Sequence, residues 1–211
     1  MTNDAVRHRN EHELERLIFF SDAVFAIAIT LLIIDVHPPM LAETASRHEW
    51  LVALLNLTPH IAAFGLSFLV IGALWVSHHT TLALLARYDA RLLWPNLLLL
   101  MSVVFLPFTS QLISVGSQNI VPFAVYSASL LVCALLKVRL TWIALNPALV
   151  AADVSAARLT AERRRMWIMP IAAAATLALA FVVPTWNCLA MMLVSVLRRL
   201  PYFRLPVGGP Q

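Results

Sequence analysis

Long apolar segments are the feature that most constrains what this chain can fold into. A helix needs about twenty consecutive, mostly apolar residues to cross the hydrocarbon of a bilayer. Six such segments occur, at approximately 17–36, 57–79, 92–113, 121–143, 166–184 and 186–200. Of the 211 residues, 61% are hydrophobic and only 12% are charged, and a soluble domain of this size cannot bury that much apolar surface. The sequence therefore predicts an all-α integral membrane protein with six transmembrane helices.

The basic residues predict how these segments are oriented. Arginine and lysine lie before the first segment, between the second and third, from the end of the fourth to the start of the fifth, and after the sixth, whereas Arg47 alone falls on the other side. The positive-inside rule then places both termini in the cytoplasm. We expect a cytoplasmic N-terminal segment at 1–16, a six-helix domain at 17–200 and a cytoplasmic tail at 201–211. Topology also explains the formal net charge of +4 better than nucleic-acid binding does.

Shorter features complete the predicted layout. We expect an interfacial helix at 48–55 and a short soluble helix at 153–165, both outside the membrane segments. Pro107 is expected to kink or end the third segment. Cys133 and Cys188 lie within apolar segments without CxxC spacing, so we expect buried side chains rather than a disulfide or a metal site.

An acidic residue, Asp22, lies inside the first apolar segment. An ionisable group in a membrane helix costs at least a few kcal/mol, so it usually faces protein or water and marks function. The second segment ends with Trp75, His78 and His79, which share one helical face at i, i+3 and i+4. Because consecutive segments run in opposite directions, this face and Asp22 lie at similar depth. We predict that indole and imidazole N–H groups bond the carboxylate; a metal site is less favoured, since adjacent histidines point about 100° apart.

Aliphatic side chains form a stripe further along the first segment. Ile27, Leu31 and Ile34 recur at i, i+4 and i+7, with Thr30 at the edge of the stripe. Asp22 lies about 140° away from Ile27 at 100° per residue, so it does not share this stripe. The first segment is apolar nearly everywhere, and spacing alone leaves lipid contact and helix packing open beside pore lining.

Taken in order, these residues resemble bacterial homologues of the endolysosomal potassium channel called transmembrane protein 175. Arg16 stands six residues before the acid of Phe20-Ser21-Asp22, the signature of that family. The matching residues that follow are Ser67-Phe68, Trp75-x-x-His78, Asn96-Leu97 and Phe105-Leu106-Pro107-Phe108. The resemblance is strong over residues 16–113 and rests on length and hydropathy beyond them.

The resemblance implies a potassium-permeable channel in the bacterial inner membrane, built as a homotetramer around a central pore lined by the first helix. It implies a pore constriction at Ile27, Leu31 and Ile34, with Thr30 as a polar pore-lining position and potassium ions passing near Ile27, Thr30 and Leu31. It also implies a signature and helix-packing network of Arg16, Phe20, Ser21, Asp22, Trp75, His78, His79 and Asn96. The expected partners are other copies of the chain and membrane lipid. No cofactor, fixed metal ion, nucleic acid or small-molecule substrate is expected.

The sequence also bears on how ions would be selected. It lacks Thr-Val-Gly-Tyr-Gly and holds only five glycines, so we expect passive conduction through a hydrophobic constriction rather than a carbonyl filter. The alternative function is a proton-coupled or small-cation transporter in which Asp22 titrates. An intramembrane enzyme using Asp22, His60, His78 and His79 is disfavoured, because no spacing such as His-Glu-x-x-His occurs.

Overall fold

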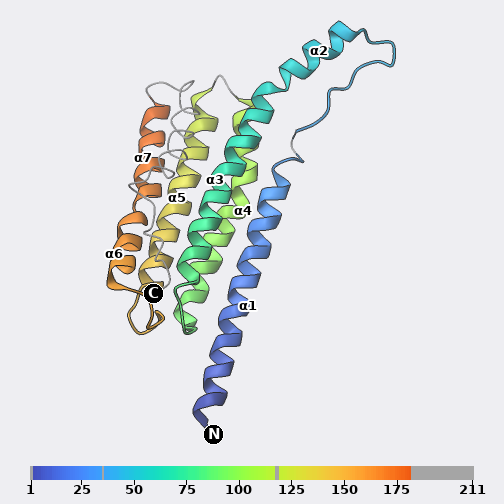
Figure 1. The fold of residues 1–211 in the computed structure, drawn as a ribbon. Helices are drawn as coiled ribbons and strands as arrows, with labels where there is room; N and C mark the ends of the chain where they lie inside the picture. The colour runs from blue at the N-terminus through green and yellow to red at the C-terminus, as the bar shows by residue number, and fades with distance from the viewer. Residues whose placement is uncertain (1, 35, 117–118, 182–211) are drawn as a thin grey trace.

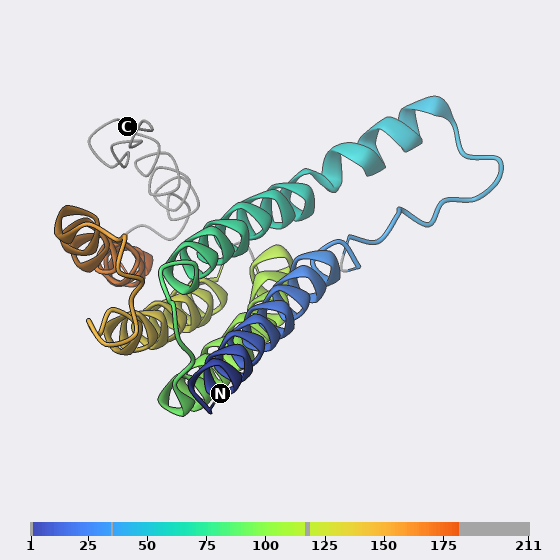
Figure 2. The same cartoon turned by 60° about the horizontal axis from the view of Figure 1, so that its bottom comes forward.

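The computed structural model describes residues 2–34, 36–116 and 119–181, and these residues form a bundle of helices (Figure 1). In chain order the elements are α1 (Thr2–Leu31), α2 (Arg47–Asn56), α3 (Thr58–Leu82), the 3-10 helix η1 (Ala90–Leu92), α4 (Leu93–Val115), α5 (Ile120–Ala144), α6 (Ala156–Arg165) and α7 (Ile168–Ala180). Helix α1 packs on α3 and α4 at one side of the bundle, and α7 packs on α5 at the other (Figures 1 and 2). Helix α2 projects beyond the bundle at one end (Figure 1).

Three helical stretches within the described residues are long and apolar enough to cross a membrane. They are Arg47–Leu82, Ala90–Val115 and Ile120–Ala144, and they contain the predicted second, third and fourth segments. Helix α7 falls within the predicted fifth segment, whose end lies outside the described residues. The predicted sixth segment and the tail at 201–211 lie entirely outside them.

Helix α1 differs from its predicted bounds of 17–36 at both ends. It begins at Thr2 and so includes the predicted N-terminal segment, because no glycine or proline interrupts it and helix-favouring Ala, Glu, Arg and Leu recur along it. It ends at Leu31, and a turn follows in which Ile34 N donates to Leu31 O at 3.2 Å. The Pro-Pro pair that starts at Pro38 restricts His37, the residue before it, and so prevents the helix from continuing through the predicted end of the segment; it does not by itself account for an end at Leu31. Ile34 therefore lies past the helix.

The predicted short helices at 48–55 and 153–165 are confirmed, and each starts at a side-chain cap. Ser46 and Glu49 form a capping box before α2: Ser46 Oγ accepts from Glu49 N at 3.3 Å, and the Glu49 carboxylate accepts from Ser46 N at 2.7 Å. Helix α6 begins after the cap residue Ser155. These caps fix where each short helix leaves its connecting loop.

Proline has different effects at two places in α4. Pro95 lies in the first turn, where its missing N–H is not needed. Pro107 lies inside the helix, which continues to Val115, so of the two expected effects the helix does not end there, and a kink stays a prediction. Membrane helices tolerate such a proline because neighbouring groups satisfy the freed backbone carbonyl.

The loop after α3 and the loop after α5 pair with each other at the end of the bundle opposite α2. Ala86 N donates to Leu149 O at 2.8 Å, and Ala151 N donates to Leu84 O at 3.0 Å. This short antiparallel bridge holds the ends of α3 and α5 in register. The polar contacts described next lie toward this end.

Candidate functional site

Asp22 of α1 accepts a hydrogen bond from α3. Trp75 Nε1 lies 2.8 Å from Asp22 Oδ1, and the ring of His79 lies against Trp75 with centroids 5.6 Å apart. An indole N–H can only donate and an ionised carboxylate can only accept, so the contact satisfies both groups. The similar depth inferred from the sequence therefore brings Asp22 and Trp75 together.

A second set of hydrogen bonds joins α1, α4 and α3 in the interior. Asn96 Nδ2 donates to Ser21 Oγ at 2.9 Å, and Ser21 Oγ donates to Leu17 O at 2.7 Å. Asn96 Oδ1 lies 2.8 Å from His78 Nε2. Because an amide oxygen can only accept, this arrangement puts the imidazole proton of His78 on Nε2. Ser21, His78 and Asn96 are all buried, so one amide connects three helices.

The two histidines of α3 serve different partners. His78 bonds Asn96 and packs against Phe25 with ring centroids 5.3 Å apart, and its Nδ1 has no hydrogen-bond partner among the described residues. His79 packs against Trp75 instead. We expected both indole and imidazole to donate to Asp22. Within the described residues the indole of Trp75 donates to it, whereas His78 bonds Asn96, because the two imidazoles point in different directions.

Two residues expected in the packing network lie on the exposed side of α1. Phe20 is 52% exposed, and Arg16 pairs with Glu13 of the same helix at an N–O distance of 4.0 Å. Helical geometry explains this placement, since positions 16 and 20 share a stripe with position 27 rather than with Ser21.

The exposed side of α1 carries the predicted aliphatic stripe. Ile27 is 57% exposed and Leu31 is 37% exposed, and Thr30 between them donates its hydroxyl proton to Ile27 O at 2.9 Å. Ile34 is exposed in the turn beyond the helix. The side of α1 that packs into the bundle bears a different set of residues, Leu14, Leu17, Ser21, Phe25 and Ala28, and Leu32 in the turn that follows is buried as well. Bulky aliphatic side chains are thus left uncovered within one copy of the chain.

Sequence reasoning missed a buried lysine in α5. Lys137 Nζ donates to Thr81 Oγ1 at 2.8 Å and to Thr141 Oγ1 at 2.7 Å, which ties α5 to α3. From the sequence, Lys137 counts only as a topology signal near the end of the fourth segment. Thr141 lies four residues after Lys137, on the same helical face. This spacing was the sequence signal that Lys137 could bond within its own helix and point into the bundle.

A cluster of hydroxyl groups was also missed. Ser67 Oγ lies 2.7 Å from Ser110 Oγ and 3.1 Å from Tyr126 Oη, so α3, α4 and α5 meet at one buried point. Interhelical hydrogen bonds of this kind are each worth about 0.6 kcal/mol in a membrane protein. The cluster supports the bundle near the middle of α3.

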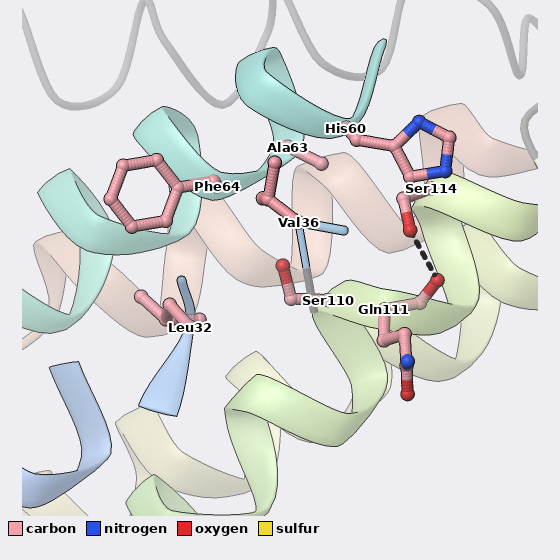
Figure 3. A pocket seen from close by; sticks show the side chains of 8 residues that line it. All are labelled: Leu32, Val36, His60, Ala63, Phe64, Ser110, Gln111 and Ser114. Carbon is pink, nitrogen blue, oxygen red and sulfur yellow. Dashed lines mark hydrogen bonds between the residues drawn. The ribbon is translucent and has the colours of Figure 1, made fainter. Parts of the chain in front are cut away.

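A small pocket lies where the end of α1 meets α3 and α4 (Figure 3). Its lining residues are Leu32, Val36, His60, Ala63, Phe64, Ser110, Gln111 and Ser114. His60 Nδ1 is buried there without a hydrogen-bond partner among the described residues, while Ser114 Oγ donates to Gln111 O at 2.8 Å. The C-terminal end of α1 therefore packs on a surface that is partly polar.

Comparisons with known proteins agree with these features. The family model described as "Endosomal/lysosomal potassium channel TMEM175" matches residues 16–107. Two curated relatives, named potassium channels of Streptomyces collinus and Chamaesiphon minutus, are each 38% identical over 135 residues, or 62% of this chain. The matched regions span 64% and 65% of those relatives, which is less than two thirds of their length.

A solved structure matches almost throughout. The crystal structure of a lysosomal potassium-selective channel TMEM175 homolog from Chamaesiphon minutus has a TM-score of 0.77 and 30% identity, with 91% of this chain and 96% of that chain covered. The matched family region contains Ser21, Asp22, Trp75, His78 and Asn96, the residues that hold α1 against α3 and α4. The chain therefore belongs to the TMEM175 family.

Proposed function

We propose that four copies of this chain form a potassium-permeable channel in which α1 of each copy lines a central pore. The observation that carries the proposal is the uncovered stripe of α1, with Ile27 and Leu31 exposed, in a chain whose relatives are named potassium channels. Conduction would be passive, and the aliphatic side chains would form the constriction.

The composition of the uncovered face favours a pore over lipid. Thr30 shares that face with the aliphatic residues, and polar side chains within a membrane segment usually face protein or water. Moreover, α1 is not among the stretches of the described residues that are apolar enough to cross a membrane on composition. A helix of this kind is stable at membrane depth when its mixed face meets water or other copies of itself.

The proposed constriction would act through side chains. Ions would pass near Ile27, Thr30 and Leu31. Ile34 follows in the turn after α1, where its side chain would set the width of the pore at that end. Thr30 gives its proton to Ile27 O and so keeps oxygen lone pairs that can face a cation. The aliphatic residues offer no such ligand, and a narrow apolar ring can close a pore by dewetting.

The polar contacts of α1 would act as the scaffold of this pore. Trp75 and Asn96 hold Asp22 and Ser21, which turn the aliphatic stripe away from the bundle. In this proposal the protein is a multi-pass protein of the bacterial inner membrane, surrounded by lipid, with both termini in the cytoplasm as the distribution of basic residues indicates.

Potassium flux into liposomes that contain the purified protein tests the proposal. Wild type is compared with Ile27→Ala and Leu31→Ala, and Leu135→Ala is the matched control, because Leu135 is 47% exposed on α5. We expect passive, potassium-preferring flux that both α1 variants alter and the control leaves unchanged. Flux that ignores both α1 substitutions would move the pore to another helix, and native mass spectrometry in detergent checks for four copies.

A second candidate function is a cation transporter that uses Asp22. The observation that favours it is that Asp22, whose carboxylate accepts from Trp75, is only partly buried in one copy of the chain. The reversal potential separates the two functions. A channel reverses at the potential set by the potassium gradient, whereas a transporter follows the ion to which it is coupled.

A further inference from the structure

We propose that Glu13 neutralises Arg16 at the N-terminal mouth of the pore, and that this ion pair keeps the mouth permeable to cations. The inference rests on the proposed function, in which α1 lines the pore. It adds a part of α1 that precedes the constriction and a residue, Glu13, to which the sequence assigned no role.

The uncovered stripe of α1 continues toward the N-terminus from Ile27 to this ion pair. At 100° per residue, Arg16 lies about 20° and Glu13 about 40° from the direction of Ile27 around the helix axis. The residues between them on this stripe, Phe20 and Ala23, are exposed as well. With a rise of 1.5 Å per residue, Arg16 lies about 16 Å and Glu13 about 21 Å along the helix from Ile27.

The structure shows that the helix carrying this stripe is unbroken. Helix α1 runs from Thr2 to Leu31, and its start extends beyond the ends of α3 and α4 (Figure 1). The Arg16 side chain is 69% exposed and that of Glu13 is 46% exposed, with an N–O distance of 4.0 Å between them. If the constriction faces the central axis, the ion pair faces the same axis at the entrance.

The charges at this entrance decide which ions can approach. Rings of arginine or lysine in a pore favour anions, and rings of carboxylates favour cations. An unpaired Arg16 in every copy would surround the entrance with positive charge and repel potassium. Glu13, three residues earlier on the same stripe, cancels that charge within each copy.

The neighbouring acids cannot replace Glu13. Glu11 lies about 160° and Glu15 about 120° from the direction of Ile27, so both point away from the proposed pore axis. Glu11 lies near His8, with an N–O distance of 3.7 Å. Glu11→Gln is therefore a matched control, since it removes the same charge from the same helix but from its other side.

Potassium flux at two ionic strengths tests the inference. Glu13→Gln is expected to lower flux at least threefold at about 10 mM salt, where the Debye length is about 30 Å, and to lower it little at about 1 M salt, where that length is about 3 Å. Glu13→Asp and Glu11→Gln are expected to keep wild-type flux. Adding Arg16→Gln to Glu13→Gln is expected to restore flux at low salt, because the charge that Glu13 neutralises is then removed.

Each outcome bears on one proposal. If Glu13→Gln behaves like Glu11→Gln while Ile27→Ala alters flux, the inference is wrong and the pore along α1 stands. If Glu13→Gln lowers flux equally at both ionic strengths, or Arg16→Gln does not restore it, Glu13 acts through folding rather than charge and the inference is also wrong. If Ile27→Ala and Leu31→Ala leave flux unchanged, it is the pore proposal that fails.

Discussion

Replacement of Asn96 by alanine is the sharpest test of how α1 is held. Asn96 is fully buried, and it bonds Ser21 on α1 and His78 on α3 at 2.9 Å and 2.8 Å. Alanine removes both contacts at once without placing a larger side chain in the bundle. The two helices would then lose the amide that joins them through α4.

The size of the effect follows from what each partner loses. The Nε2–H of His78 is left unsatisfied in the interior, which costs about 1–3 kcal/mol. Ser21 keeps its bond to Leu17 O and loses only a donor, which is worth about 0.6 kcal/mol in a membrane protein. The higher helix propensity of alanine offsets about 0.5 kcal/mol. With the small void that remains, we expect a loss of about 2–4 kcal/mol in the free energy of unfolding.

Thermal melting in detergent measures this loss. For a chain of this length, about 2–4 kcal/mol corresponds to a fall in Tm of roughly 4–16 °C. Asn56→Ala is the control, because Asn56 is exposed at the end of α2 and its loss should stay within about 0.5 kcal/mol. The pair His78→Phe with Asn96→Leu removes donor and acceptor together and should recover most of the lost stability. Melting of Asn96→Ala within 1 °C of the control, or a paired variant no better than the single one, would refute the reasoning.

Three further substitutions test other contacts, each by Tm in detergent. Trp75→Phe keeps the ring and removes the N–H bonded to Asp22, so a double-mutant cycle with Asp22→Asn should give a coupling of about 0.6–1.7 kcal/mol; additive effects would contradict the bond. Gly116→Ala places a Cβ 2.5 Å from the Pro122 ring and should cost about 1–3 kcal/mol, whereas Gly72→Ala meets nothing within 4 Å; equal effects would show that the ring yields. Ser46→Ala removes the cap of α2 and should cost about 1 kcal/mol; no change would mean that the box does not stabilise the fold.

The sequence predicted the elements of this fold better than the contacts between them. Apolar length located three membrane-capable stretches, and local composition located both short helices, because those signals are local. The end of α1 was misplaced, since apolar residues continue past Leu31 and hydropathy does not report where a helix stops. The start of α1 at Thr2 was also missed, because the predicted segment was located by hydropathy, and the charged residues before position 17 lower hydropathy without preventing a helix.

The polar interior shows where such prediction stops. Asp22 and Trp75 were paired correctly from depth, because antiparallel neighbours place matching heights side by side. Lys137 and the hydroxyl cluster around Ser67 were not found. These contacts depend on how each helix is rotated about its axis, and helices that are apolar on every side carry no pattern that reports this rotation.

Ser21 and Asp22 are adjacent, yet each is bonded to a different helix. Beyond them α1 meets the bundle through apolar side chains such as Phe25 and Ala28, which can slide without breaking a directional bond. Helix α1 can therefore tilt about this hydrogen-bonded pair, and Leu31 lies about 14 Å along the helix from it. A tilt of α1 by about 5° about this pair moves Leu31 by about 1 Å at that distance. In the proposed channel, small changes at the hydrogen-bonded end would be amplified into a change of bore at the far end.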